Sequence, residues 1–169
     1  AGIKTHFIQY AGPALMLCKK VDIIPIEVVV RNYADGSIVR QTTIEKYTKF
    51  NPPLIEFYLK DDEKNDPLLT EDRLHIMGYR QLHQYKQYAR EVNAVVSGLF
   101  EKIGITLIDF KIEFGVTADG TVVVADEISP DGCRLLAEGN QSMDKDLFRK
   151  GEGDIIEAYT KILEGLRGL

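Results

Sequence analysis

The chain has 169 residues, among them no tryptophan, two cysteines and three histidines, and it contains no long uninterrupted apolar run. Two cysteines are too few for a disulfide framework or a paired-cysteine metal motif, so we expect a reducing compartment, the cytoplasm. No apolar run has the length of a membrane span, and the first residues lack the basic and apolar sections of a signal peptide. The isolated histidines show no paired ligand spacing, which favours packed or surface roles for them.

The net charge of -5 argues against broad binding to a nucleic-acid backbone, although a local basic pocket for a small phosphorylated ligand remains compatible with it. Hydrophobic residues make up 44% of the chain, which is enough for a core in one domain or in two small lobes. We therefore expect a globular protein with a hydrophobic core.

The strongest strand pattern covers residues 108–116, where apolar residues alternate with charged ones. The charged positions share one face of that strand and are Asp109, Lys111 and Glu113. A second strand pattern covers residues 121–128, and the Asp119-Gly120 dipeptide between the two suits a two-residue hairpin turn.

A two-residue turn places Glu113 directly opposite Asp126, on the same face as Lys111, with the two Cβ atoms about 5 Å apart. A cation would relieve the repulsion between the carboxylates, and an all-oxygen site with one or two protein carboxylates favours Mg²⁺. Two alternatives stay open, namely that both carboxylates are solvated or that Lys111 pairs with one of them. A slip of one residue in the register would separate the two carboxylates.

The run from Ser129 to Arg134 is rich in turn-forming residues and returns a carboxylate and a guanidinium toward the strand that carries Asp126. Together, DFKIEFG (109–115) and ADEISPDGCRL (125–135) resemble the core of the SAICAR synthetase family, the phosphoribosylaminoimidazole-succinocarboxamide synthases of the purine pathway. The resemblance implies an α+β, ATP-grasp-like, two-lobed fold with an antiparallel sheet and packed helices, mainly its larger lobe. Residues 1–21 would then form the end of the N-terminal lobe and the hinge, and residues 22–169 the larger lobe.

The pattern at residues 24–32 predicts a strand buried on at least one face, followed by a turn at 34–37 and a second strand at 38–41. Arg31 and Ser37 would lie near one hairpin end, where a guanidinium and a hydroxyl can hold a phosphate, although generic hairpins often carry both residue types. The segment IPIEVVVRNYADGS (24–37) is similar to the family segment that approaches the ribotide substrate. The resemblance implies that Arg31 and Ser37 bind its phosphate.

The nucleotide site is assigned by resemblance. Residues 18–21 and Ile23 match the family's hinge, which holds adenine, although Ile23 by itself is equally compatible with a core position. Lys60, in NPPLIEFYLKDDEKNDP (51–67), matches a lysine that reaches the nucleotide, and Asp66 would order the same loop. The charged run at 60–67 by itself indicates only a solvated loop. The nucleotide-binding set implied is Cys18, Lys19, Lys20, Val21, Ile23, Lys60 and Lys111.

Helical signals begin at Thr70, a suitable N-cap, and Gly78 separates a short helix from a longer one at 79–103 that Gly104 ends. Asp154 is predicted to cap a last helix. The apolar stripe of the long helix consists of Leu82, Tyr85, Ala89, Val92, Val96, Leu99 and Ile103. Short strands are expected at 15–21 and 54–59.

The implied reaction joins L-aspartate to carboxyaminoimidazole ribotide through an acyl phosphate and gives SAICAR, ADP and phosphate, with ATP as co-substrate and Mg²⁺ as the metal. Glu113 and Asp126 would hold Mg²⁺ and Lys111 would stabilise developing charge, so these three form the catalytic set. The substrate-binding set would be Arg31, Ser37, Asp131 and Arg134. No nucleic acid or membrane partner is expected, and a homo-oligomer is compatible with the sequence.

The chain departs from the family pattern in two places. Leu135-Leu136 stands where the family often has a tryptophan, which concerns the pocket wall and leaves the charged positions unaffected. The family's glycine- and lysine-containing loop over the ATP phosphates is expected upstream of Ala1. Two alternatives to the ligase therefore stay open: a related phosphotransferase, and a lobe that binds nucleotide or ribotide without turnover.

Overall fold

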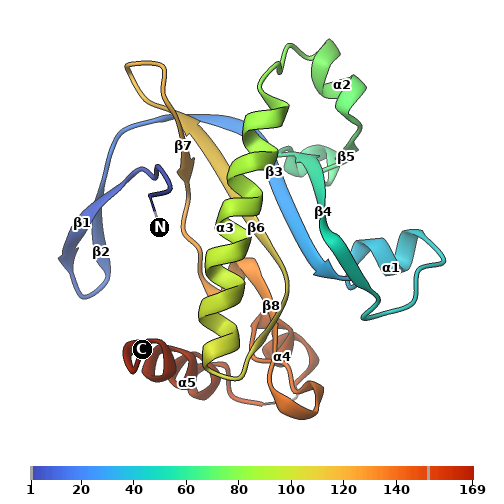
Figure 1. Cartoon of the computed structure of the whole chain (residues 1–169), viewed down its shortest axis with the longest axis vertical. Coiled ribbons are helices and arrows are strands. Elements are labelled where there is room, and N and C mark those ends of the chain that lie inside the picture. Colours follow the sequence, from blue (N-terminus) through green and yellow to red (C-terminus); the bar gives the residue numbers. More distant parts are fainter. Residues whose placement is uncertain (1, 152) are drawn as a thin grey trace.

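The structure, a computed structural model, describes residues 2–151 and 153–169, with the side chains of all of these except 148–150. The fold is α+β, with one six-stranded antiparallel sheet and a separate β1-β2 hairpin (Figure 1). Five strands of the sheet follow the order β5-β4-β3-β6-β7, and the sixth strand, β8, pairs with β6. The strands are β1 (Phe7–Gly12), β2 (Leu15–Cys18), β3 (Asp22–Tyr33), β4 (Lys49–Leu59), β5 (Leu68–Leu69), β6 (Thr106–Val116), β7 (Val122–Ala125) and β8 (Cys133–Leu136). The helices are α1 (Ser37–Gln41), α2 (Glu71–Ile76), α3 (Leu82–Lys102), α4 (Lys145–Lys150) and α5 (Ile155–Arg167), with short 3-10 turns that include η1 (Asp62–Lys64) and η2 (Pro130–Gly132).

The two faces of β3 and β6 differ in chemistry because side chains alternate across a strand. One face is apolar and belongs to the core, with Ile26, Val28 and Val30 of β3 and Phe110, Ile112 and Phe114 of β6. On the opposite face, the register pairs Glu27 with Glu113, Val29 with Lys111 and Arg31 with Asp109. The charged face that the sequence indicates for β6 is therefore confirmed and continues onto β3.

Helix α3 lies along the apolar face of the sheet, where the ring of Tyr85 stacks on Phe114 with centroids 5.2 Å apart (Figure 1). Its C-terminal end is as predicted, because Gly104 has φ of 73° and the backbone N–H of Ile105 donates to the carbonyl of Phe100. The predicted stripe is confirmed except at Leu99, which is 39% exposed and lies beyond the edge of the sheet contact. The predicted caps Thr70 and Asp154 each accept a backbone N–H at the start of α2 and α5.

The predicted strand at 38–41 is wrong, since Ser37–Gln41 form the short helix α1. Strand β3 already pairs with β4 on one edge and with β6 on the other, so no edge is left for a hairpin partner at 38–41. The left-handed conformation of Gly36, with φ of 67°, turns the chain out of β3 into the helix instead.

The register predicted for the β6-β7 hairpin is also wrong, by one residue. The backbone N–H of Thr117 donates to the carbonyl of Thr121, so the loop has three residues and ends at Gly120 with φ of 81°. Asp119 accepts hydrogen bonds from the hydroxyl of Thr117 and the N–H of Thr121, which stabilises this longer loop. As a result Glu113 pairs with Ala125, and Asp126 lies one residue beyond the end of β7.

The β1-β2 hairpin stands apart from the main sheet (Figure 1). It carries exposed apolar side chains, including Tyr10 and Leu15. Strand β2 ends at Cys18, earlier than the predicted Val21, because the chain crosses from there to β3. Among the described residues, no helix is both long and apolar enough to cross a membrane.

Candidate active site

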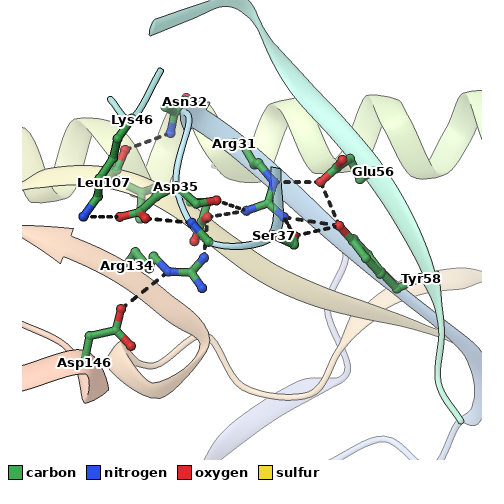
Figure 2. Close-up of polar contacts among 12 residues, drawn as sticks. Arg31, Asn32, Asp35, Ser37, Lys46, Glu56, Tyr58, Leu107, Arg134 and Asp146 are labelled. Carbon is green, nitrogen blue, oxygen red and sulfur yellow. Dashed lines mark hydrogen bonds and ion pairs between the residues drawn. The ribbon is translucent and has the colours of Figure 1, made fainter. Parts of the chain in front are cut away.

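The polar face of β3 and β6 forms the floor of a cavity of about 260 Å³. Four of the sequence-predicted site residues line it together: Arg31, Ser37, Lys111 and Arg134. They come from β3, α1, β6 and β8, so the paired strands and the turn at Gly36 bring them together from distant parts of the chain. Figure 2 shows the Arg31 end of this site, with Arg134 between that end and Asp146.

Arg31 is 2% exposed and its guanidinium lies inside a complete set of protein acceptors. A guanidinium has five N–H donors, and each has a partner here (Figure 2). Nε donates to Glu56 (2.7 Å), Nη1 to Asp109 (2.6 Å) and the carbonyl of Asp35 (3.2 Å), and Nη2 to Ser37 (2.7 Å) and Tyr58 (3.3 Å). Burial lowers the pKa of Arg31, but Glu56 and Asp109 raise it above the ordinary value, so the charge is retained. In this arrangement Arg31 holds its neighbours in place and has no donor left for a ligand.

Asp109 joins Arg31 to Arg134, because its Oδ2 accepts from Nη1 of Arg31 at 2.6 Å and from Nη1 of Arg134 at 2.7 Å. Burial raises the pKa of Asp109, while the two guanidinium groups oppose that shift. Nε of Arg134 lies 3.7 Å from a carboxylate oxygen of Asp146. Arg134 is therefore oriented by carboxylates on two sides and still lines the cavity.

Two lysines and two glutamates lie further along the same face. Nζ of Lys60 donates to both oxygens of Glu113, at 2.7 and 2.9 Å, and Nζ of Lys111 donates to Glu27 at 2.7 Å and reaches Glu113 at 3.5 Å. Burial lowers the pKa of Lys111, but the hydrogen bond and charge of Glu27 raise it above the ordinary value. Glu113 is 2% exposed, so its negative charge is held in the protein by the two lysines. The ion pair of Lys111 with Glu113, at 3.5 Å, agrees with the alternative that Lys111 pairs with one of the two carboxylates, whereas its shorter ion pair with Glu27 was not anticipated.

Asp126 belongs to the same charged group although it is not opposite Glu113. Burial raises its pKa, but a hydrogen bond with Glu127 and the charges of Lys111 and Lys60 lower it below the ordinary value. The pKa of Glu127 is raised, mainly by the hydrogen bond and the charge of Asp126. The two neighbouring carboxyl groups oppose each other's ionisation, and a cation would relieve that opposition.

These oxygen donors fit Mg²⁺, which commonly takes one or two protein carboxylates and completes its shell with water and substrate phosphates. Among the described residues, no group of three or more His, Cys, Asp or Glu side chains forms a metal cage by itself. One or two of these carboxylates would therefore suit a magnesium ion that arrives with a phosphorylated ligand.

The predicted hinge residues lie at the Glu113 end of the face. Ile23 pairs with Gly115 across β3 and β6 and is 46% exposed, so the alternative that it is a core residue is wrong. A Cβ on Gly115 would lie 2.5 Å from Cγ2 of Val21, so this glycine allows the hinge to pack closely on β6. The loop after β4 is tied to the same end, because Lys60 N–H donates to the carbonyl of Pro25 and Asp66 accepts the N–H of Asp61. The expected ordering role of Asp66 is confirmed.

Cys18, Lys19 and Lys20 connect β2 to β3, and the N–H of Lys19 donates to the carbonyl of His6. Asp131, in η2, does not line the cavity that contains the other predicted ribotide-binding residues, Arg31, Ser37 and Arg134. It accepts a hydrogen bond of 2.6 Å from the hydroxyl of Tyr159 in α5, which fixes the loop before β8.

The sequence profile described as SAICAR synthetase matches residues 1–166. This chain belongs to the SAICAR synthetase family. The phosphoribosylaminoimidazole-succinocarboxamide synthase of Pseudomonas fluorescens is 46% identical over 170 residues, which cover 98% of this chain and 72% of that protein. The enzyme of the same name from Persephonella marina is 48% identical, over 98% of this chain and 71% of its own length.

Solved structures of this SAICAR synthetase family agree with the fold. A structure described as SAICAR synthetase in complex with ADP has a TM-score of 0.94 and 40% identity, covering 99% of this chain and 73% of its own. SAICAR synthetase from Pyrococcus horikoshii has a TM-score of 0.93 and 40% identity, and the match covers 99% of this chain and 75% of that one. The enzyme from Saccharomyces cerevisiae, at 18% identity and a TM-score of 0.75 over 98% of this chain and 74% of its own, shares the fold.

Sequence reasoning missed several residues of this SAICAR synthetase site. Glu27 stands four residues before Arg31 in a strand, so the period of two already places both on one face. Glu56 and Tyr58 have the same spacing in β4, but their proximity to Arg31 depends on the β3-β4 register, which no local pattern specifies. Two further cavity residues were also missed: Arg40, which carries no signal beyond its charge, and Lys145, which lies in the segment 143–149 that resembles the family.

Proposed function

We propose that this chain catalyses the phosphoribosylaminoimidazole-succinocarboxamide synthase reaction of de novo purine biosynthesis, in the cytoplasm. L-Aspartate is joined to carboxyaminoimidazole ribotide at the expense of ATP, giving SAICAR, ADP and phosphate. The observation that carries this proposal is the continuous polar face, which joins a guanidinium-lined cavity at Arg134 to the paired lysines and carboxylates around Glu113. One face can thus hold the ribotide phosphate at one end and the reacting phosphoryl group at the other.

The carboxylate of the ribotide must be activated before an amine can attack it, because a carboxylate is a poor electrophile. An oxygen of the ribotide carboxylate attacks the γ-phosphorus of ATP, and ADP leaves, so that an acyl phosphate forms. The amine of aspartate then attacks the acyl carbon, the phosphate departs with the oxygen that joined it to carbon, and the nitrogen loses a proton. Catalysis of such a transfer comes from positioning and from charges placed in advance, with no protein nucleophile.

Lys111 and Lys60 supply cationic charge at the transferring group, and Glu27 fixes the position of Lys111. Glu113 and Asp126 would hold Mg²⁺. When bound, the ion neutralises charge on the phosphate oxygens of the nucleotide. Both oxygens of Glu113 accept hydrogen bonds from Lys60, so a bound Mg²⁺ would share this carboxylate with that lysine.

The nucleotide is assigned to the hinge end of the face. Adenine would contact the backbone and apolar atoms of Cys18, Lys19, Lys20, Val21 and Ile23, with Lys60 and Lys111 directed at its phosphates. Residues 1–21 would be the end of an N-terminal lobe and the hinge, and residues 22–169 the larger lobe.

The ribotide is assigned to the cavity at the other end. Ser37 and Arg134 would contact its phosphate, and Asp131 its sugar or ring. Arg31 would act on the ribotide through Ser37, to which it donates at 2.7 Å, and through Asp109, which it shares with Arg134.

The test is ADP release by the protein with magnesium and ATP, with aspartate or the ribotide left out in turn. The ligase requires both substrates for continued ADP release. Release that is independent of aspartate would indicate a phosphotransferase and contradict the proposal. Ribotide binding without ADP release would assign the chain to binding without turnover.

A further inference from the structure

Gly115 lies where the sheet meets the predicted hinge. It is buried in β6, with Ile23 of β3 opposite on one side and Val123 of β7 opposite on the other. Because side chains alternate along a strand, position 115 belongs to the same face of β6 as Lys111 and Glu113. The polar face therefore carries no side chain at the position that follows Glu113 on that face.

Val21 of the hinge fills the space that a side chain on Gly115 would need. An ideal Cβ at position 115 would lie 2.5 Å from Cγ2 and 2.8 Å from Cβ of Val21, and 3.5 Å from the carbonyl oxygen of Asp22. Gly115 is in a regular strand and is not among the glycines with positive φ, so it is the contact and not the backbone conformation that requires glycine. A side chain here would have to push Val21 back by about 1 Å to restore an ordinary carbon–carbon contact.

The pairing of β3 with β6 brings this contact close to Glu113. Glu27 pairs with Glu113. Continuous pairing from there would place Pro25 opposite Gly115, but Ile23 is found at that position. Two extra residues of β3 are taken up between the two pairs, in an irregularity that contains Pro25, which has no N–H for the ladder. The hinge therefore reaches β6 two residues nearer to Glu113 than regular pairing would allow, or about 7 Å nearer.

The other edge of β3 keeps its regular pairing. Ile26 pairs with Leu59 of β4, and the N–H of Lys60 donates to the carbonyl of Pro25 at 3.1 Å. The irregularity is thus confined to the edge that faces β6. Since Nζ of Lys60 also donates to Glu113, the hinge end of β3 is connected to this carboxylate on both sides.

We propose that Gly115 is a positioning residue for the nucleotide, because it sets the distance between the hinge and Glu113. The inference rests on the proposed function, which assigns adenine to the hinge and the metal at the phosphates to Glu113. A nucleotide must contact both ends at once, so the distance between them decides whether the two sets of contacts form together. Gly115 acts through Val21, which can lie directly on β6 only where that strand has no side chain.

The experiment measures binding of ADP with magnesium, and of carboxyaminoimidazole ribotide, by calorimetry. Gly115→Ala is compared with the unaltered protein, and the same substitution is then made together with Val21→Gly, which removes both side-chain atoms that the new methyl group would meet. The matched control is Gly98→Ala in α3, where an added Cβ has nothing within 4 Å. Thermal melting of each variant checks that the fold is retained.

Gly115→Ala should weaken ADP binding and raise KM for ATP by about 10- to 100-fold, the range expected when two linked contacts are displaced by about 1 Å. Ribotide affinity and KM for aspartate should change by less than about twofold, as should every parameter of the control. In the presence of Val21→Gly, the substitution at Gly115 should weaken ADP binding by less than about twofold further, because the steric conflict is gone.

A second variant places the added bulk on the hinge side of the same contact. Val21→Leu leaves β6 unchanged and should show the same selective loss of ADP affinity, which keeps the inference testable if Gly115→Ala does not fold. Equal ADP affinity in Val21→Leu and the unaltered protein would then contradict it.

Three results with folded Gly115→Ala would overturn the inference. ADP affinity could be unchanged, ribotide affinity could fall as much as ADP affinity, or the loss could be equally large in the presence of Val21→Gly. Unaltered protein that binds no ADP would overturn it as well. A protein that shows the expected ADP pattern but no aspartate-dependent ADP release would contradict the proposed ligase and leave this role of Gly115 supported.

Discussion

Arg134 occupies the space that a side chain at Gly36 would need. An ideal Cβ at Gly36 would lie 2.6 Å from Nη2 and 2.8 Å from Cζ of Arg134, and the residue has φ of 67°, a region that other residues rarely adopt. Glycine therefore serves two purposes here, since it turns the chain into α1 and lets the guanidinium lie against the backbone of the turn.

Replacing this glycine tests whether Arg134 must lie there. Gly36→Ala should displace the guanidinium and weaken ribotide binding by about 10- to 100-fold, the range expected for losing a hydrogen bond to a charged group. It should also cost about 1 kcal/mol of unfolding free energy for the left-handed backbone. Calorimetric titration and urea unfolding measure the two effects separately.

Gly120→Ala is the matched control, because Gly120 has φ of 81° and nothing within 4 Å of its Cβ position. The control should lose similar stability and keep its ribotide affinity. Equal ribotide affinity in the two variants would show that the contact with Arg134 does not matter for binding.

Arg31 should be required for stability more than for direct ligand contact. In Arg31→Met, the buried Glu56 would lose its cation and Asp109 would keep only Arg134, and breaking such a buried pair costs about 3–5 kcal/mol. Urea unfolding monitored by circular dichroism should show this loss, whereas Arg90→Met on the surface of α3 should change stability by less than about 0.5 kcal/mol. A loss in Arg31→Met as small as that of the control would rule out the anchoring role.

Glu27 should control the charge of Lys111. Its hydrogen bond and charge raise the pKa of Lys111 against the effect of burial, so in Glu27→Gln that pKa should fall. Lys111 must be protonated to stabilise negative charge, so kcat should fall and the alkaline limb of its pH profile should move to lower pH. Glu45→Gln, at an exposed position, serves as the control. An unchanged alkaline limb in Glu27→Gln would contradict this link.

Glu113 should be needed for magnesium-dependent turnover. Glu113→Gln keeps the shape of the side chain and one oxygen that can accept a hydrogen bond from Lys60, but removes the negative charge that a magnesium ion requires. Turnover should fall by at least about 100-fold with the melting transition intact, and more magnesium should be needed for half-maximal rate. A variant with normal turnover and normal magnesium dependence would eliminate Glu113 as a metal ligand.

The polar face could be predicted from the sequence because strands impose a period of two. Lys111 and Glu113 lie on one face of β6, and Glu27 and Arg31 lie on one face of β3, however the strands pair with each other. The partner of Glu113 could not be predicted in the same way. It depends on whether the hairpin loop has two or three residues, and that choice is made by the Asp119 side chain bonding to Thr117 and Thr121.

The environment of Arg31 was beyond prediction for a different reason. Its acceptors come from β4 and β6 and from the turn before α1, so their convergence is a property of the assembled sheet. The sequence pattern at α1 predicts a strand, because five residues carry too little periodicity to distinguish a helix from a strand. The segment cannot pair with β3 as a strand, because β4 and β6 already occupy both edges of β3.

Oxygen transfer from the ribotide carboxylate tests the ligase chemistry most directly. The ribotide is prepared with oxygen-18 in its carboxylate and incubated with the protein, magnesium, ATP and aspartate, and the released phosphate is analysed by mass spectrometry. The acyl phosphate route transfers one labelled oxygen to phosphate in each turnover, because the carboxylate oxygen that attacks phosphorus leaves with it. Phosphate that is formed during SAICAR synthesis without the label would contradict the mechanism.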